Sequence, residues 1–132
     1  MGISHKAMKP AARLALPDYV ELRCVSHFTF LRGASSPAEL VERAQNLGYQ
    51  ALALTDECSM AGVVRAHVAA KAVGLPLLLG SQFRIQPHDA TEASCVLVVL
   101  AQNLNGYGNL CAFITKLRRS SEKGSYHLTL DH

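Results

Sequence analysis

The stretch Ala51-Leu52-Ala53-Leu54-Thr55-Asp56-Glu57-Cys58 decides the fold expected for this chain. Its first four residues are apolar without alternation, and a polar cluster follows them at once. Such a run is typical of a strand buried on both faces, in a parallel sheet that helices cover. We therefore predict a strand at 51–54. Ligands and catalytic groups collect at the carboxyl ends of parallel strands, which puts Asp56 at the mouth of the sheet.

Helix and strand patterns alternate on both sides of this stretch. Residues 19–25 alternate as a first strand does. Ser36, Pro37 and Glu39 predict a helix start, because serine caps, proline suits the first helical position and the glutamate completes a capping box. Gly48 predicts the end of that helix. The remaining elements are expected as a helix from a cap at Ser59 to about Val73, a strand at 75–83, a buried strand at 95–100 and a helix at 106–122.

The order of these elements is the signature of parallel βαβ units with right-handed crossovers. The chain reaches 128–132 without a final helix, whereas a closed barrel takes about 200 residues or more. We predict an α/β fold of mostly parallel strands that ends before barrel closure, preceded by a flexible tail at 1–17. The apolar face of the second helix is expected at Val63, Val64, His67 and Val68.

Composition limits the classes of function. The chain has 132 residues, of which 49% are hydrophobic and 17% charged, and this suits one folded core. A net charge of +3 and a pI of about 8.8 permit a polyanionic partner, without the dense basic stripe of a sequence-specific DNA reader. No apolar run approaches the roughly 20 residues that span a bilayer, so no membrane partner is expected. The absence of Cys-x-x-Cys spacing predicts reduced thiols in a cytoplasmic protein; the cysteines are Cys24, Cys58, Cys95 and Cys111.

Polar side chains gather at the predicted strand ends, but their types suit a metal site poorly. A multinuclear metal site needs several His, Asp or Glu side chains from different strands. Here Arg23 is a cation and Gln82 is a neutral amide. We therefore interpret Asp56 as paired with Arg23, or as capping the helix that follows Ser59. The other polar candidates at these strand ends are Ser26, His27, Glu57, Cys58 and Ser81.

Three other features have simple interpretations. Gly106-Tyr107-Gly108 lacks the third glycine of a dinucleotide-binding fingerprint and predicts a helix start instead. His27 is interpreted as a hydrogen-bonded loop residue, and His67 as a packed one. The basic residues of the last helix suit the negative end of its dipole, with a DNA contact as the alternative; they are Lys116, Arg118, Arg119 and Lys123.

Three stretches together resemble the N-terminal PHP (polymerase and histidinol phosphatase) domain of bacterial C-family DNA polymerases. Within that family they are most similar to the error-prone branch, the paralogues of the DNA polymerase III alpha subunit. The stretches are YVELRCVSHFTFLRGAS at 19–35, ALALTDECSMAGVVRAH at 51–67 and LAQNLNGYGNL at 100–110. The resemblance implies that 18–132 is the N-terminal part of a PHP-type (β/α) barrel, with the polymerase core outside these residues.

The resemblance also indicates which positions would bind metal. Metal-binding members carry Leu-His-x-His-Ser on the first strand, where this chain has Arg23 and Val25 in place of the histidines. The Thr-Asp-His motif reads Thr-Asp-Glu here and ends in Glu57, and the glutamate expected after the third strand is Gln82. Asp56 is thus the only retained ligand-type position. The resemblance predicts a degenerate site, with no metal cofactor and no catalytic residue in this segment.

For the parent protein, the resemblance implies a cytoplasmic DNA-directed DNA polymerase that copies damaged templates with low fidelity, with Mg²⁺ in its polymerase core. Its partners would be the rest of the polymerase chain, DNA, and other replication or mutagenesis proteins. This segment is expected to be a structural or docking module that is marginally stable in isolation. Two alternatives remain: an active metal-dependent PHP phosphoesterase or proofreading nuclease, and a free-standing interaction protein made from a truncated reading frame.

Overall fold

The computed structural model describes residues 17–89, 91 and 93–131. The flexible tail predicted at 1–17 therefore lies outside the described residues, apart from Pro17. None of the helices in the described part of the chain is long and apolar enough to cross a membrane. The elements, in chain order, are β1 (Val20–Cys24), α1 (Pro37–Leu47), β2 (Ala51–Glu57), α2 (Val63–Val73), β3 (Leu77–Ile85), β4 (Cys95–Leu100) and α3 (Leu104–Arg119).

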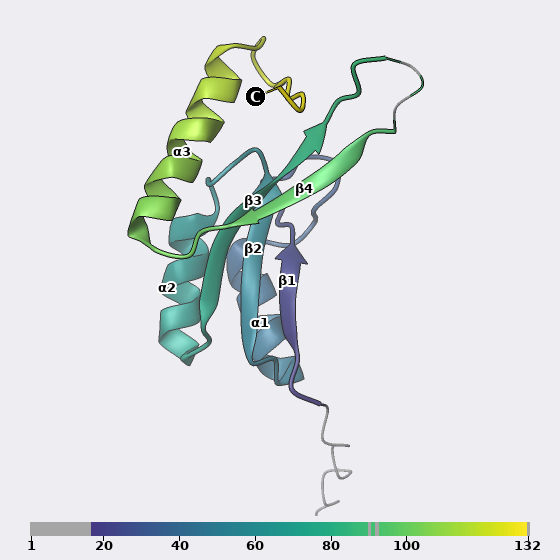
Figure 1. Ribbon diagram of the computed structural model, residues 1–132. Helices are drawn as coiled ribbons and strands as arrows, with labels where there is room; N and C mark the ends of the chain where they lie inside the picture. The colour runs from purple at the N-terminus through teal and green to yellow at the C-terminus, as the bar shows by residue number, and fades with distance from the viewer. Residues whose placement is uncertain (1–16, 90, 92, 132) are drawn as a thin grey trace, which may run out of the picture.

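The four strands form one mixed sheet in the order β1-β2-β3-β4 (Figure 1). β1, β2 and β3 run parallel to one another, and β4 runs antiparallel to β3. The predicted α/β fold, a partial barrel of mostly parallel strands, is confirmed. The antiparallel pairing of β4 was not predicted. It follows from the connection at 86–94, which is shorter than the dozen or so residues that a parallel crossover requires.

Helix α1 begins and ends where its sequence predicts. The Ser36 hydroxyl accepts a hydrogen bond from the Glu39 N–H at 3.2 Å, and the Glu39 carboxylate accepts one from the Ser36 N–H at 2.6 Å. These bonds lower the pKa of Glu39. Gly48 ends the helix with a φ of 76°, in the left-handed region that glycine tolerates best. The capping box thus fixes where the chain turns away from β1.

Apolar side chains from β2 and β3 pack into two clusters, one under α1 and α2 and the other under α3. Leu52 and Leu54 face α1 and α2, where they meet Val41 and Ala66. Under α3, Phe83 of β3 packs in a second cluster, whose other buried members are Cys58, Leu110, Leu117 and Leu128. Side chains alternate between the faces of a strand. The side chains of β2 next to Leu52 and Leu54 therefore point to the opposite face of the sheet, away from α1 and α2.

The second strand is longer than its apolar run predicts, and the next helix begins later. Thr55, Asp56 and Glu57 continue the ladder, paired with Gly80, Ser81 and Gln82 of β3. Asp56 therefore lies within β2 and not after it. The prediction that Ser59 caps the next helix was wrong: its hydroxyl accepts a bond from the Ala61 N–H in a turn, and α2 begins at Val63 without a side-chain cap.

Two predicted buried faces were wrong in part, and on α2 the prediction is confirmed only for Val63. On α2 the buried residues are Val63, Ala66 and Ala70, while Val64 is 71% exposed and Val68 is 63% exposed. His67 is exposed with them. The small side chains of Ala66 and Ala70 therefore face the core, in the cluster that contains Leu52 and Leu54. The strand predicted to be buried at 95–100 is an edge strand whose first three residues are exposed.

Candidate functional site

Asp56 is the one position at which the sequence retains a metal-ligand type of side chain. Its carboxylate accepts three hydrogen bonds from other residues of the chain. Oδ1 accepts hydrogen bonds from the Ser26 N–H at 2.6 Å and the Thr29 hydroxyl at 2.7 Å. Oδ2 accepts one from the Ser26 hydroxyl at 2.7 Å. The side chain is 1% exposed. Asp56 therefore anchors the loop between β1 and α1, and its predicted roles as a partner of Arg23 or a helix cap were wrong.

The anchored loop, residues 26–35, is tightly closed and presents an apolar tip. The Ser35 carbonyl accepts a bond from the His27 N–H at 2.8 Å, and the His27 ring lies against Phe28. A Cβ at Gly33 would lie 1.9 Å from the Ser26 carbonyl oxygen, so this position requires glycine. At the tip, Phe30 is 81% exposed and Leu31 is completely exposed, with a φ of 65°. The interpretation of His27 as a hydrogen-bonded loop residue is confirmed for its backbone.

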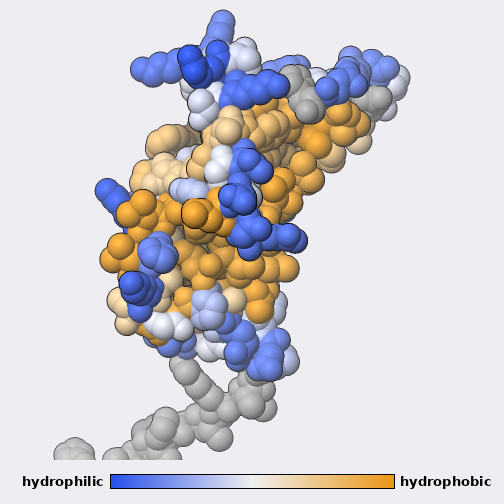
Figure 2. Space-filling view, turned by 60° about the vertical axis from the view of Figure 1, so that its left-hand side comes forward, coloured by the Kyte–Doolittle hydropathy of each residue, from blue (hydrophilic) through white to orange (hydrophobic). Residues whose placement is uncertain are grey.

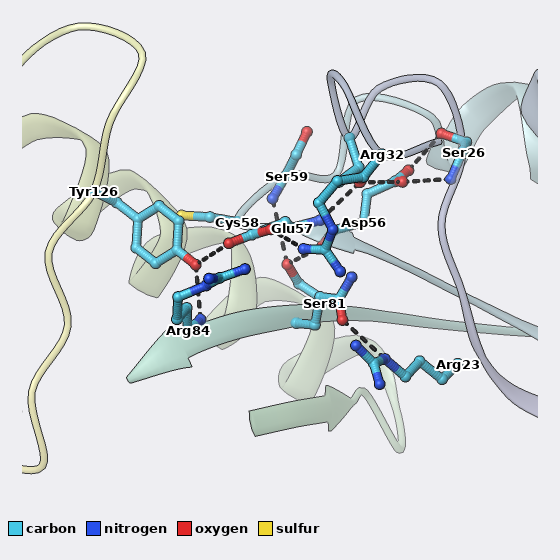
Figure 3. Close-up of polar contacts among 12 residues, drawn as sticks. Arg23, Ser26, Arg32, Asp56, Glu57, Cys58, Ser59, Ser81, Arg84 and Tyr126 are labelled. Carbon is cyan, nitrogen blue, oxygen red and sulfur yellow. Dashed lines mark hydrogen bonds and ion pairs between the residues drawn. The ribbon is translucent and has the colours of Figure 1, made fainter. Parts of the chain in front are cut away.

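On the opposite face of the sheet from Asp56, two of the family ligand positions bind each other. Arg23 Nε donates to Gln82 Oε1 at 3.0 Å (Figure 3). Because an arginine nitrogen can only donate, this bond fixes which end of the Gln82 amide is oxygen. The amide nitrogen Nε2 is then a buried donor that has no acceptor among the residues the structure describes. Arg23 thus supplies a cation where a histidine ligand would stand.

Glu57, the third of these positions, is held by residues that the sequence analysis did not single out. Its carboxylate pairs with Arg32 from the loop and accepts a 2.6 Å hydrogen bond from the Tyr126 hydroxyl. That hydroxyl in turn accepts a bond from the Arg84 N–H at 2.7 Å. Burial, together with the neighbouring carboxylate, raises the pKa of Tyr126 to about 12. Figure 3 shows Arg32 and Arg84 extending toward Glu57 from different sides.

The remaining candidates serve the fold. Ser81 donates its hydroxyl to the Asp56 carbonyl at 2.7 Å and so ties β3 to β2. Arg118 donates to the Cys58 carbonyl and lies over the Tyr126 ring, with its guanidinium carbon 5.4 Å from the ring centroid. One member of the predicted basic cluster therefore stabilises the fold, whereas Lys123 lies beyond the end of α3 and was wrongly placed on that helix. All four cysteines are free thiols, and burial raises the pKa of Cys24 to about 11, which keeps that thiol protonated.

These arrangements do not suit a metal cluster. Neighbouring residues of a strand point to opposite faces, so Asp56 and Glu57 do not converge. The Asp56 oxygens already accept three hydrogen bonds, Arg23 repels cations, and Val25 has no donor atom. Within the ranges 17–89, 91 and 93–131, no three His, Cys, Asp or Glu side chains gather in a way that could hold a metal ion.

A cavity of about 310 Å³ opens beside these residues at the mouth of the sheet. Its lining combines cationic, polar and aromatic side chains from the loop, β3 and the C-terminal segment. The lining residues include Phe28, Phe30, Glu57, Arg84, Arg118 and Tyr126. Sequence reasoning missed Arg32 and Tyr126, since nothing in the local pattern of either residue indicates a partner 25 or 69 positions away.

The PHP domain model matches residues 21–131. The error-prone DNA polymerase of Ralstonia nicotianae is 58% identical over 118 residues, which is 89% of this chain and 11% of that protein. The error-prone DNA polymerase of Burkholderia mallei is 54% identical over 125 residues, covering 90% of this chain and 12% of that protein. The chain thus spans about a tenth of the length of these relatives.

Among solved structures, a putative metal-dependent phosphoesterase from Bifidobacterium adolescentis matches with a TM-score of 0.61 and 25% identity. That match covers 84% of this chain and 35% of the other. An amidohydrolase from Chromobacterium violaceum, solved with bound SO4 and no metal, matches with a TM-score of 0.62 and 26% identity over 76% of this chain and 34% of the other. Both matches agree with the half-barrel in Figure 1.

Proposed function

The chain belongs to the PHP domain family, and from that premise we propose that it is the PHP segment of an error-prone DNA polymerase, acting there as a metal-free structural module. The polymerase would be a DNA-directed nucleotidyltransferase of the cytoplasm, with DNA as its substrate and Mg²⁺ in a core outside these residues. Its low fidelity would suit translesion synthesis in DNA repair and damage-induced mutagenesis. The identity of 58% to a protein of that name supports the assignment.

One observation carries the metal-free role: the side chains at the family ligand positions bind other groups of the chain. Arg23 and Gln82 are bonded to each other, Glu57 is paired with Arg32, and the Asp56 carboxylate anchors the loop. A cation at Asp56 would have to displace the protein donors of its carboxylate, and a cation on the opposite face would meet the Arg23 guanidinium in place of an imidazole. The active phosphoesterase or nuclease alternative needs ligands that these residues do not supply.

The module's role as a platform is supported by its uncovered apolar surface. Figure 2, which brings the left-hand side of Figure 1 forward, shows apolar residues across the middle of the molecule. An open groove of about 780 Å³ lies between the start of β3 and the start of α3. Its apolar lining residues include Leu77, Leu78, Leu79, Leu100, Leu104 and Tyr107. Exposed apolar patches of this kind mark interaction sites, here for the rest of the polymerase chain or for other replication proteins.

Elemental analysis of protein purified without chelator tests the metal-free role. The expected result is less than one zinc, manganese or iron per chain. The matched control is a variant in which the family ligands are rebuilt together, Arg23→His, Val25→His, Glu57→His and Gln82→Glu, which should take up more metal than the natural chain. Several tightly held metals per natural chain would overturn the proposal.

The polymerase assignment is tested separately. The coding DNA downstream of codon 132 is expected to continue in frame into a polymerase core, and the full-length protein is expected to extend a DNA primer. Deleting 18–132 from that protein should lower its stability and its activity together. A full-length protein that keeps both without this segment would rule out a structural role.

A further inference from the structure

The charges of the chain are distributed unevenly along its sequence. Residues 93–121, which include β4 and α3, contain no Asp or Glu, and their three charged residues are all cations in the last turn of α3. The next acidic residue along the chain, Glu122, comes after this helix has ended, and Lys123 follows it directly. Exposed helices usually carry charges of both signs. α3 therefore differs from an ordinary solvent-exposed helix in the sign of its charge.

The cations of this region have different surroundings. Arg118 points inward, where it donates to a backbone carbonyl and lies over the Tyr126 ring. Lys116, Arg119 and Lys123 are exposed. Within the described ranges 17–89, 91 and 93–131, none of these three side chains forms a hydrogen bond or an ion pair. Three cations thus remain available to a partner, whereas Arg118 serves the fold.

An exposed line of residues runs along the outer side of α3, and we call it the polar line of α3. Its members recur every three or four positions, which places them on one side of a helix. α3 has 16 residues and is therefore about 24 Å long. In Figure 1 it lies at the left border of the molecule. All members of the line are exposed, and none is a large apolar residue: Asn105, Asn109, Ala112, Lys116 and Arg119.

The cationic end of this line borders an open hollow of about 550 Å³. Lys116 and Arg119 line the hollow together with the small or hydroxyl-bearing side chains of Ala112, Thr115 and Ser120. The hollow shares no lining residue with the cavity at the mouth of the sheet. The polar line of α3 is therefore a separate surface on the outside of the half-barrel.

The helix dipole accounts for only part of this arrangement. It favours cations in the last turn of a helix. Like charges three or four positions apart repel each other, however, and this applies to Lys116 with Arg119 and to Arg119 with Lys123. The dipole also gives no reason for the absence of acidic residues throughout 93–121. A polyanionic partner would relieve the repulsion, because each of its charges can lie beside a different cation.

The composition of the line favours DNA over an acidic protein as that partner. Protein interfaces have an apolar core, and the polar line of α3 has no large apolar member. Leu104, the exposed leucine at the start of the helix, lies off this line and borders the apolar groove instead. Interfaces with DNA are more polar and more positively charged. Lysine, arginine and asparagine side chains are frequent donors to phosphate oxygens.

We propose that the polar line of α3 is a contact surface for the phosphate backbone of DNA, in which Lys116 and Arg119 each hold one phosphate and the asparagines donate further hydrogen bonds. Contacts to the backbone carry no sequence information, so the surface holds DNA of any sequence. The inference rests on the proposed polymerase function, which brings DNA to this module. It gives the module a direct hold on DNA, in addition to its structural role.

The test measures how the binding of DNA by the full-length protein depends on salt. A fluorescein-labelled duplex of about 30 base pairs is titrated with the protein at chloride concentrations of about 50–200 mM, with EDTA present and anisotropy as the readout. The slope of log Kd against log salt counts the phosphate contacts, at about 0.9 for each contact to duplex DNA and about 0.7 for each contact to a single strand. A single strand of the same length and polyglutamate are the other probes.

Two variants and two controls separate a contact from a general effect of charge. Lys116→Gln and Arg119→Gln should each reduce the slope for the duplex by about 0.9 and weaken binding about eightfold at about 0.1 M salt. Neither should change the midpoint of thermal unfolding, because both side chains are exposed and unpaired among the described residues. Arg43→Gln makes the same charge change on the exposed side of α1 and should leave the slope unchanged. Arg118→Gln makes it on α3 itself and should lower the unfolding midpoint without a change in slope.

The form of DNA follows from the probe whose binding the variants reduce more, the duplex or the single strand. Three results would overturn the inference: a slope that the combined Lys116→Gln and Arg119→Gln change leaves unaltered, an equal reduction by Arg43→Gln or Arg118→Gln, or polyglutamate that competes as well as DNA at equal charge. Primer extension is measured on the same preparations. An unaltered slope in a protein that still extends primers would leave the polymerase assignment standing, whereas a natural protein that neither binds DNA nor extends primers would overturn both.

Discussion

Replacing Asp56 by alanine should destabilise the chain more than any other single loss of a carboxylate in the described residues, because this carboxylate is buried and accepts three hydrogen bonds. Asp56→Ala would leave the Ser26 N–H, the Ser26 hydroxyl and the Thr29 hydroxyl without their acceptor. Hydrogen bonds to a charged group contribute about 1.5–3 kcal/mol each, and a stranded buried donor costs about 1–3 kcal/mol.

These contributions do not add in full. Both hydroxyls can rotate toward other acceptors, whereas the Ser26 N–H cannot, and removal of a buried charge offsets part of the loss. We therefore expect Asp56→Ala to lower the free energy of unfolding by about 3–5 kcal/mol, a large part of the usual 5–15 kcal/mol of a domain. Asp56→Asn keeps Oδ1 and should cost about 1–2 kcal/mol.

Equilibrium urea unfolding followed by circular dichroism measures these differences. The matched control is Asp18→Ala, since Asp18 is exposed and accepts one bond from Gln50 Nε2 at 3.2 Å. It should change the free energy of unfolding by less than about 0.5 kcal/mol. The loop-anchor assignment fails if Asp56→Ala costs no more than this control. It also fails if added Mn²⁺ or Zn²⁺ stabilises the natural chain but not the Asp56→Ala variant.

Three further changes test the loop, the mouth and the corrected face of α2. Gly33→Ala should lower the free energy of unfolding by about 2–3 kcal/mol in urea, because its Cβ would overlap the Ser26 carbonyl oxygen; an unchanged value would mean that the loop is not closed. The folded pKa of Tyr126, about 12, lies above its ordinary value of 10.0. The stabilisation from its neutral phenol is therefore complete below pH 10 and is lost as the pH rises toward 12. Tyr126→Phe should lack this part of the decline when unfolding midpoints are compared across that range, and parallel declines would contradict the burial of the phenol. Val68→Ser should be neutral within about 0.5 kcal/mol, whereas Ala70→Val should cost about 1–3 kcal/mol; the reverse order of these two costs would restore the original prediction for α2.

The sequence predicts the elements wherever a local signal specifies a backbone conformation. Ser36, Pro37 and Gly48 act within one turn of the helix, so the bounds of α1 follow from them. The end of β2 does not follow from hydrophobicity, because Thr55 and Asp56 are polar residues kept in the strand by pairing with β3 and by bonds to the β1–α1 region. Strand ends of this kind depend on partners distant in the chain, and a window of neighbouring residues contains no information about them.

The candidate site could be predicted as a set of positions but not as a set of contacts. The replacement of ligand-type residues at 23, 25, 57 and 82 can be read directly from the sequence. The partners of these residues cannot, because the bond between Arg23 and Gln82 spans 59 positions and the pair of Arg32 with Glu57 spans 25. The expected pairing of Asp56 with Arg23 failed for a simple reason. Two side chains of opposite charge that both lie at strand ends can still point to opposite faces of the sheet.

The contacts at the mouth also determine how hard it would be to restore a metal site. Gln82→Glu alone would place a carboxylate against Arg23, and the two would form an ion pair in place of the present bond. Glu57→His alone would leave Arg32 and the Tyr126 hydroxyl without their shared acceptor. Arg23→His alone would leave Gln82 with no partner for its oxygen as well as its nitrogen. Each single change therefore removes a bond that stabilises the fold before it adds a useful ligand. Only the combined change can recover metal binding, and a single substitution that did so would contradict this account of the mouth.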